Sequence, residues 1–472
     1  MGSNSPSGAG NNGPAGNAFP VRARNILSSR AVWIFPLVIG SILVALITVF
    51  YIGSVVNPLG HLHGLPVAVV NQDQGAAAGP RRIDVGETVQ AGLSHAPAVS
   101  SRLGLDDTTL RAAEQVMNRG GSYATVVIPA GFTASLLSLA GVPGSRPASG
   151  RPEILILTNQ RAGTEAVGLA TGVLEPALAA ASRQIGRQLA AAAPPPSSPA
   201  TRVFLADPVT VTTVLYRPLP SHTALGLSAF YIALLTLFCG FLGATIVNSS
   251  VDVALGYATT ETGPMFRQRR PVPINRWHTL IIKWVIAAPL TGIMTGILLL
   301  IAVAGLGMNA PNVGLLWLLA WLCAASVAAG TLVLLAVLGN LGQLVALIIF
   351  VYAGLASVGG TVPLEALPTV LRWLAEVEPL RQVLAGTRAI LYFNARADAG
   401  LTRSVAASAA GLGFWLIAGA AIVRWYDAKG LNRLDPELLA YIDASADTYR
   451  SRGSSAPEQG SGSADKPADP DR

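Results

Sequence analysis

The sequence predicts an α-helical polytopic membrane protein with about six transmembrane helices and an α/β extracytoplasmic domain inserted between the first and second helices. Two observations lead to this prediction. Of the 472 residues, 51% are hydrophobic and only 12% are charged, whereas soluble domains carry roughly 25% charged residues. The chain also contains six apolar runs of spanning length, arranged as one run, a long mixed segment at 56–220, and then five runs.

The first apolar run, residues 31–51, has the roughly 20 residues that a spanning helix needs. It is too long for the apolar part of a signal peptide and lacks a clear small-x-small cleavage site, so we assign 25–55 to an uncleaved first transmembrane helix. Residues 1–24 are rich in Gly, Ser, Asn and Pro, which predicts a disordered tail, and 431–472 are interpreted in the same way.

The segment 56–220 has the pattern of an α/β domain. Short runs rich in β-branched residues predict strands at 65–71, 123–128, 153–158 and 209–216.

Helical patterns separate these strands. Asp106 and Asp107 are expected to begin one helix, since acidic side chains suit its amino end, and 131–139 is a short second helix. A longer helix at 164–192 should pack on the sheet. Its apolar face consists of Leu174, Leu178, Ala181, Ile185 and Leu189.

Residues 221–430 contain the other five predicted spans. The fourth and fifth are separated only by residues 339–342. The five runs lie at about 223–247, 279–305, 313–338, 341–358 and 405–423.

Basic residues beside the spans predict the orientation, because cytoplasmic flanks retain Lys and Arg. With six crossings, all three basic clusters fall on one side, so both termini are expected in the cytoplasm and 56–220 outside the plasma membrane. The net charge of +7 then reflects topology and not a nucleic-acid partner. The clusters are Arg22, Arg24 and Arg30; Arg267, Arg269, Arg270 and Arg276; and Arg424, Lys429 and Arg433.

The second cluster, at 267–276, could contact a partner chain. The alternative is that these arginines only enforce topology and bind anionic lipid.

No motif in the sequence indicates catalysis. There is no G-x-x-x-x-G-K-[ST], so ATP-driven work would need a separate nucleotide-binding chain. H-E-x-x-H, C-x-x-C and G-x-S-x-G are absent too, so we expect no catalytic, cofactor-binding or metal-binding residues and no enzyme activity. His61 and His63 are interpreted as part of a plain juxtamembrane loop.

The predicted spans contain almost no ionisable side chains. Lys283 is the exception, and we expect it to extend to the cytoplasmic interface; a role in ion coupling is the alternative. A proton-driven antiporter is therefore disfavoured. Gly292 and Gly296 would allow close helix packing, either within the chain or in a homodimer.

The segment 361–396 is too charged to span a bilayer and too apolar for a free loop. It predicts two amphipathic helices in the outer membrane interface, or alternatively two surface helices packed on the outer domain. Their expected stripes are Leu367, Leu371, Leu374 and Val377, and then Leu380, Val383, Leu384, Ile390, Leu391 and Tyr392.

Two motifs and the order of the spans resemble a known family. LPVAVVNQDQGA at 65–76 follows the first span, and ATVVIPAGFTASLL lies at 124–137. Together they resemble the YhgE/Pip (phage-infection protein) group of the ABC-2 type permease superfamily, and the outline is similar to the nitrosoguanidine-resistance-protein-like membrane family. The signature turn consists of Asn71, Asp73 and Gly75.

The resemblance implies a function. It implies an ABC-2-like permease subunit, either alone or as a homodimer, that exports lipidic or amphipathic, toxic compounds. A separate ATPase subunit would supply the energy. The prolines at 363, 368 and 379 are similar to the re-entrant hairpin of ABC-2 permeases. The alternative is a cell-envelope scaffold or receptor that acts through its outer domain without transport. An enzyme of lipid metabolism is a third interpretation, but it lacks any catalytic constellation.

Overall fold

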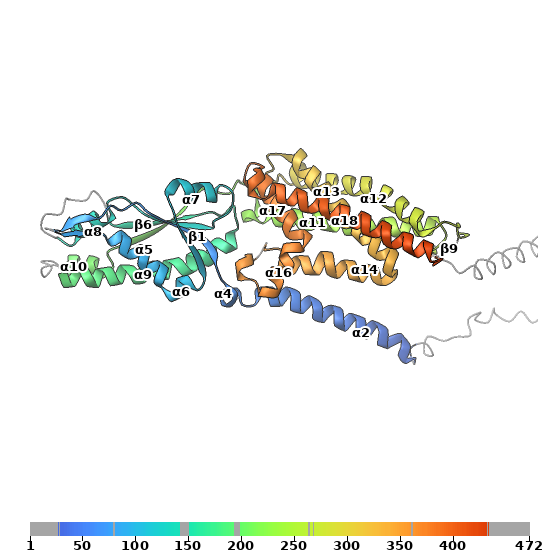
Figure 1. Ribbon diagram of the computed structural model, residues 1–472, viewed down its shortest axis with the longest axis horizontal. Coiled ribbons are helices and arrows are strands. Elements are labelled where there is room, and N and C mark those ends of the chain that lie inside the picture. The colour runs from blue at the N-terminus through green and yellow to red at the C-terminus, as the bar shows by residue number, and fades with distance from the viewer. Residues whose placement is uncertain are drawn as a thin grey trace, which may run out of the picture.

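The protein is elongated, with a sheet and its helices at one end and a bundle of long helices at the other (Figure 1). The computed structural model describes residue 27 and residues 29–78, 81–141, 151–192, 199–262, 265–267, 269–359, 362–431 and 433. The tails predicted at 1–24 and 431–472 lie outside these residues, except for 431 and 433.

The sheet has five strands in the order β4-β1-β5-β6-β7. β1 pairs in parallel with β4 and β5, β5 pairs antiparallel with β6, and β6 pairs in parallel with β7. Four of these strands confirm the sequence prediction. The bounds of all five strands are β1 Leu65–Asn71, β4 Leu103–Asp107, β5 Ala124–Ile128, β6 Glu153–Thr158 and β7 Thr210–Leu215.

Strand β4 corrects the prediction for Asp106 and Asp107, which end this strand and do not begin a helix. β4 is an edge strand, so only Leu103 and Leu105 turn toward the core and the carboxylates stay exposed. Helix α7 (Leu110–Met117) begins later, where the Thr109 hydroxyl accepts a hydrogen bond from the Ala112 N–H at 3.4 Å.

Helix α9 (Thr164–Ala192) covers one face of the sheet, as its apolar pattern predicts. Leu174, Leu178 and Ile185 are buried against the strands. Helix α7 covers the other face. The remaining elements of this region are α4 Pro58–His61, β2 Ala76–Ala78, β3 Arg81–Ile83, α5 Val85–His95, α6 Pro97–Ser100, α8 Phe132–Leu139 and α10 Pro199–Ala206.

Six helical segments among the described residues are long and apolar enough to cross a membrane, which confirms the predicted number of spans. The fourth and fifth are separated at Gly339, whose φ of +62° turns the chain sharply. The six are Val32–Val55, Ser228–Ala254, Arg276–Gly305, Val313–Leu338, Asn340–Ser357 and Leu401–Ala428.

By element, the first span comprises α2 (Arg30–Ile47), η1 (Thr48–Ile52) and α3 (Gly53–Val55). The fifth comprises α14 (Asn340–Ala346), η4 (Leu347–Tyr352) and α15 (Ala353–Ser357). The others are α11 Ser228–Ala254, α12 Arg276–Leu299 with η3 Leu300–Gly305, α13 Val313–Leu338 and α18 Leu401–Ala428.

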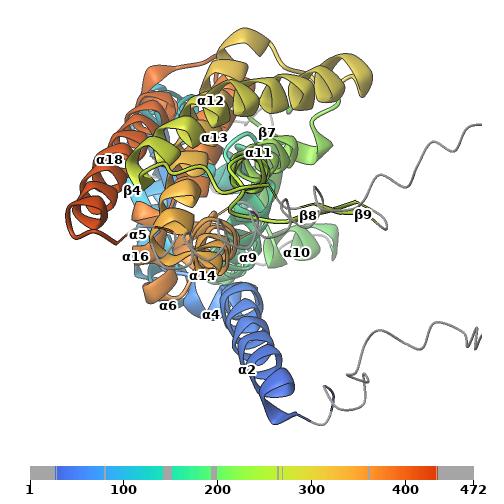
Figure 2. The same ribbon diagram turned by 90° about the vertical axis from the view of Figure 1, so that its right-hand side faces the viewer.

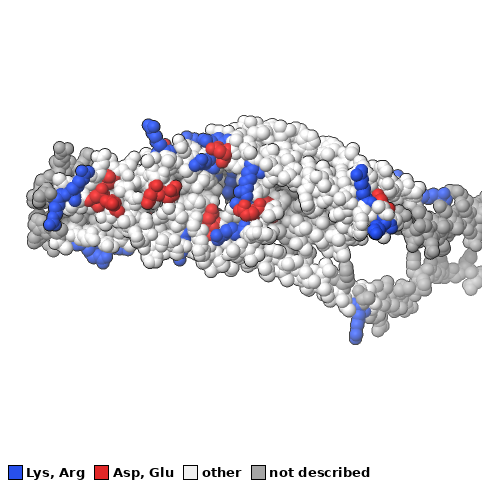
Figure 3. Space-filling model, viewed as in Figure 1, with Lys and Arg blue, Asp and Glu red and all other residues white. Residues whose placement is uncertain are grey.

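Helices α11, α12, α13 and α18 pack on one another, whereas α2 stands apart from them (Figures 1 and 2). On the face drawn in Figure 3, charged side chains gather over the sheet region and its junction with the helices, and again at the far end of the bundle. A belt without them lies between. An uncharged belt on helices of this length is what a bilayer core requires.

The hairpin predicted at 361–396 consists of η5 (Leu364–Ala366), α16 (Thr369–Val377) and α17 (Pro379–Tyr392). Helix α17 is buried against α11, α13 and α18, whereas Ala366 of η5 joins the apolar core of the sheet region. In the first stripe, Leu367 and Leu371 are buried against the chain, whereas Val377 is 73% exposed. Short elements complete the chain: η2 Ala224–Gly226, β8 Thr260–Thr262, β9 Met265–Arg267 and η6 Ala397–Ala399.

Candidate functional site

The bundle contains an apolar cavity of about 460 Å³ between α13, η4, the hairpin and α18. Phe350 and Trp415 meet edge to face in its wall, with ring centroids 5.9 Å apart. Polar atoms are sparse. Cys323 Sγ and Ser408 Oγ lie 3.0 Å apart and satisfy each other, and Gln382 Nε2 donates to the Glu376 carbonyl at 3.2 Å. The cavity therefore suits a ligand with an apolar body and few hydrogen-bonding groups.

A buried carboxyl group lies in the hairpin beside this cavity. Glu378 joins two residues that line it and is 3% exposed. Its Oε2 caps α17 by accepting hydrogen bonds from the N–H groups of Leu380 (2.7 Å) and Arg381 (3.3 Å). Burial raises the pKa of Glu378 to about 8, although these two bonds act in the opposite direction. Its Oε1 has no hydrogen-bond partner among the described residues.

Nothing in the sequence prediction singled out Glu378. The available signal was its place directly before Pro379, because an acidic cap followed by proline is a common start of a helix.

A charged cluster lies at the end of the bundle farthest from the sheet. Lys283 Nζ donates to Asp252 Oδ1 at 2.8 Å and to Asn248 Oδ1 at 2.7 Å, and Arg433 Nη1 donates to the same Asp252 oxygen at 2.7 Å. Lys283 is only 4% exposed, so its ammonium group is held by these partners at the end of the bundle and not by solvent. A cavity of about 280 Å³ lies beside these side chains.

Sequence reasoning missed Asp252 and Asn248, and it used Arg433 only as a sign of topology. Each comes from a different stretch of the chain than Lys283, and only the packing of α12 on α11 and the return of the chain after α18 bring them together.

The four arginines predicted as partner or lipid contacts have different surroundings. Arg269 and Arg270 are exposed. Arg276 is half-buried at the start of α12, and its backbone N–H donates to Asp427 Oδ1 at 3.1 Å. Arg267 ends β9, but its side chain lies outside the described part of the chain. Among the members whose side chains the structure describes, Arg269 and Arg270 are thus the accessible ones.

The signature turn after β1 is organised around Asp73. The Thr133 N–H donates to Asp73 Oδ1 at 3.2 Å, the Thr133 hydroxyl makes a short bond to Oδ2, and the Gly86 N–H donates to Oδ2 at 3.3 Å. The Asn71 side chain accepts from the Asp73 N–H at 3.0 Å, and Gly75 has a φ of +66°. The turn therefore ties β1 to the amino ends of α5 and α8.

A family model described as protein of unknown function (DUF3533) matches residues 36–406. The chain belongs to this family. The matched residues of this DUF3533 protein run from the first candidate span to the start of α18, so they include the signature turn and the hairpin.

Comparison with curated proteins finds no match. Among solved structures, this DUF3533 chain is similar to a domain of a proposed ABC type-2 transporter from Thermotoga maritima MSB8, with 21% identity and a TM-score of 0.22. That similarity covers 32% of this chain and 86% of the other.

In this DUF3533 protein, Gly292 and Gly296 face α13 of the same chain. A Cβ atom at Gly292 would lie 3.0 Å from Trp321 Nε1, and one at Gly296 would lie 3.4 Å from Trp317 Nε1. The two indoles stack, with centroids 5.3 Å apart, and the Trp317 indole N–H donates to the Gly292 carbonyl at 3.0 Å. The absence of side chains at both glycines leaves the space that the indoles occupy.

Proposed function

We propose that this DUF3533 protein is an ABC-2-type, permease-like subunit of the plasma membrane that exports lipidic or amphipathic compounds. The observation that carries the proposal is the apolar cavity of about 460 Å³ that opens on the side of a bundle of membrane-length helices, where Phe414 and Val377 are exposed at its rim. Its volume lies within the roughly 300–1,000 Å³ of small-molecule sites, and its wall is apolar, as for such sites generally.

In the proposed topology, the hairpin lies on the outer side of the cavity. The sheet region, inserted between the first and second spans, lies outside the membrane, and both termini lie in the cytoplasm. The α16–α17 hairpin then forms the outer wall of the cavity, since it occupies the bundle at the end near the sheet (Figure 1). A compound in the cavity would leave past this hairpin.

A separate ATPase subunit supplies the energy in this proposal, because the sequence has no P-loop. Arg269 and Arg270 are exposed at the end of the bundle far from the sheet and would meet such a partner or anionic lipid. The chain itself would act on its cargo by binding and movement, not as an enzyme.

The cavity can be tested by filling it. Ala407 lines the cavity, whereas its neighbour Ala406 does not and is exposed on α18. We expect Ala407→Trp to lower the efflux of a fluorescent amphipathic dye from cells about tenfold, and Ala406→Trp to leave it unchanged. Equal efflux for both variants at equal membrane abundance would argue against a cavity-based export path.

The energy source needs its own experiment. After mild crosslinking in membranes, purification should recover a nucleotide-binding chain with the wild type and less of it with Arg269→Glu/Arg270→Glu. Failure to recover such a chain, together with unchanged efflux on gene deletion, would contradict the permease proposal. Rescue of a deletion phenotype by residues 57–219 on an unrelated span would instead favour the scaffold alternative.

A further inference from the structure

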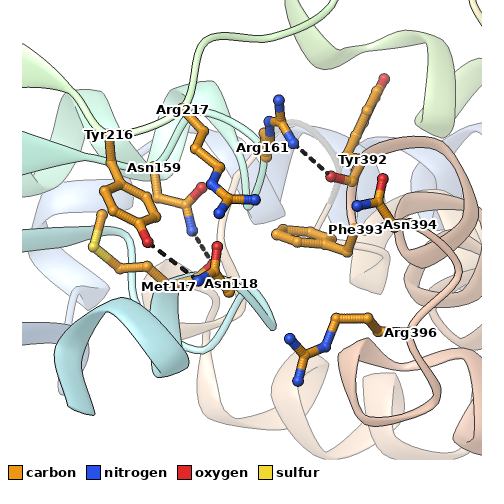
Figure 4. A pocket seen from close by; sticks show the side chains of 10 residues that line it. All are labelled: Met117, Asn118, Asn159, Arg161, Tyr216, Arg217, Tyr392, Phe393, Asn394 and Arg396. Carbon is orange, nitrogen blue, oxygen red and sulfur yellow. Dashed lines mark hydrogen bonds between the residues drawn. The ribbon is translucent and has the colours of Figure 1, made fainter. Parts of the chain in front are cut away.

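A small pocket of about 110 Å³ lies where the sheet region meets the helices, and arginine side chains surround it (Figure 4). Arg161 follows β6 and Arg217 follows β7. Since β6 and β7 are parallel, their carboxyl ends meet at one edge of the sheet, which brings these two guanidinium groups together. Arg396 approaches from the loop after α17 (Figure 4).

Hydrogen bonds to backbone carbonyls fix the position of Arg161. Its Nε and Nη2 donate to the Pro218 carbonyl at 3.2 and 3.0 Å, and its Nη1 donates to the Tyr392 carbonyl at 3.1 Å. These acceptors are uncharged, so they orient the guanidinium without neutralising it. A guanidinium has five N–H donors, which leaves donors free for a further acceptor.

The pocket has an excess of positive charge. Neither Arg161 nor Arg217 has a carboxylate partner among the described residues, whereas Arg396 is paired with Asp398 at 3.0 Å. Burial and the neighbouring charge of Arg217 both lower the pKa of Arg161. Two like charges held side by side are unfavourable unless an anion lies between them.

The neutral side chains of the pocket also have unused hydrogen-bonding capacity. Asn118 Nδ2 lies 3.1 Å from the Tyr216 hydroxyl, and the buried Asn118 Oδ1 has no partner within the described residues. Because a phenol can donate as well as accept, reversing the amide keeps this bond and leaves N–H donors free. Asn394 contributes a second amide from a turn in which it and Ala395 have φ of +54° and +55°.

We propose that this pocket binds a phosphate group. Arginine forks match the planar pairs of oxygens that a phosphate offers, and a pocket of this volume accepts a headgroup but no acyl chain. The phosphate belongs either to a phospholipid headgroup of the adjacent leaflet or to free phosphate. Binding would join the sheet region to the helices, whether or not the protein transports anything.

The test uses the full-length protein in maltoside micelles, which contain no phosphate. Binding of inorganic phosphate, of dihexanoyl phosphatidic acid and of the uncharged dihexanoyl glycerol would be measured by calorimetry at low and high salt. We expect phosphatidic acid or phosphate to bind, and binding to weaken with salt. The glycerol ester should not bind. Saturable binding of phosphate alone identifies a free-phosphate site, and binding of the lipid alone identifies a headgroup site.

Two variants and one control connect the binding to the pocket. Arg217→Gln removes an exposed side chain that holds no backbone group in place, so it should fold normally and weaken binding about tenfold. Arg161→Gln should weaken it at least as much. Arg111→Gln, which removes an exposed arginine on α7 outside the pocket, should change nothing.

Three results would overturn the proposal: no binding of either phosphate probe, equal binding by the Arg217→Gln and Arg111→Gln variants, or equal binding of the uncharged glycerol ester.

Discussion

Lys283 and Asp252 form an ion pair of 2.8 Å between the third and second candidate spans, with both side chains almost fully buried. Asn248 and Arg433 complete the hydrogen bonding around the pair. Removing Asp252 leaves two cations, Lys283 and Arg433, without a carboxylate, whereas removing Lys283 leaves Asp252 still paired with Arg433.

We therefore expect Asp252→Asn to destabilise the protein by about 3 kcal/mol, Lys283→Met to cost less because Arg433 still neutralises Asp252, and the double variant to lose less than the sum. Thermal unfolding in detergent, followed by tryptophan fluorescence, measures all three. The exposed pair Arg396–Asp398 is the matched control, and Asp398→Asn should hardly change the midpoint. Strict additivity of the two buried changes would contradict a direct pair.

The Asp73 turn gives a prediction for the sheet region. Asp73→Ala removes the acceptors of the Thr133 and Gly86 N–H groups, so we expect a loss of about 1–3 kcal/mol. Hydrogen exchange should rise at the amino ends of α5 and α8 while the bundle is unchanged. Gln74→Ala, a change at the exposed neighbouring residue, is the control. Unaltered exchange in α8 would show that the turn does not depend on this carboxylate.

The buried Glu378 predicts a pH dependence of stability. Its pKa in the folded protein is about 8, above the ordinary value of 4.5, so folding favours the protonated form. This contribution is complete below about pH 4.5 and is lost as the pH rises through about 8. The midpoint of thermal unfolding should therefore fall by several degrees between pH 5 and pH 9, because the unfolded protein loses this proton more easily than the folded protein.

Glu378→Gln should remove most of this fall, because a side-chain amide of nearly the same size does not titrate between pH 5 and pH 9. The comparison variant is Glu376→Gln, whose carboxylate is exposed and paired with Arg381 and Arg403. A Glu378→Gln profile that is parallel to the wild type would assign the pH dependence to another group.

Gly292 predicts a packing defect. In Gly292→Leu the new side chain would meet the Trp321 indole, whose N–H donates to the Ala288 carbonyl at 2.8 Å. We expect a loss of about 1–3 kcal/mol and a shift in tryptophan emission as the indole is displaced. Gly40→Leu, at a position in α2 with nothing within 4 Å, is the control and should change neither property. Unchanged emission for Gly292→Leu would mean that the Trp321 indole does not pack closely against Gly292.

The local sequence pattern was sufficient to predict the spans and most of the sheet. Long apolar runs indicate spanning helices, and short runs rich in β-branched residues indicate strands. The pattern failed at Asp106, since an acidic pair suits an exposed strand edge as well as the start of a helix. The local pattern also could not identify residues whose partners are distant in the sequence. Asp252 gains its significance only because packing places Lys283 beside it, and Glu378 only because α17 is buried.

The place of Tyr392 between the two parts of the protein has a mechanical consequence. Its hydroxyl lies 2.7 Å from Ser228 Oγ and donates to the Gly226 carbonyl at 3.2 Å, at the start of α11, while its carbonyl accepts from Arg161 beside the sheet. One residue at the end of α17 is thus attached on both sides. A turn or slide of α17 in the bundle would stretch the hydrogen bond between Arg161 and the Tyr392 carbonyl, so movement of this helix is coupled to movement of the sheet region through Tyr392.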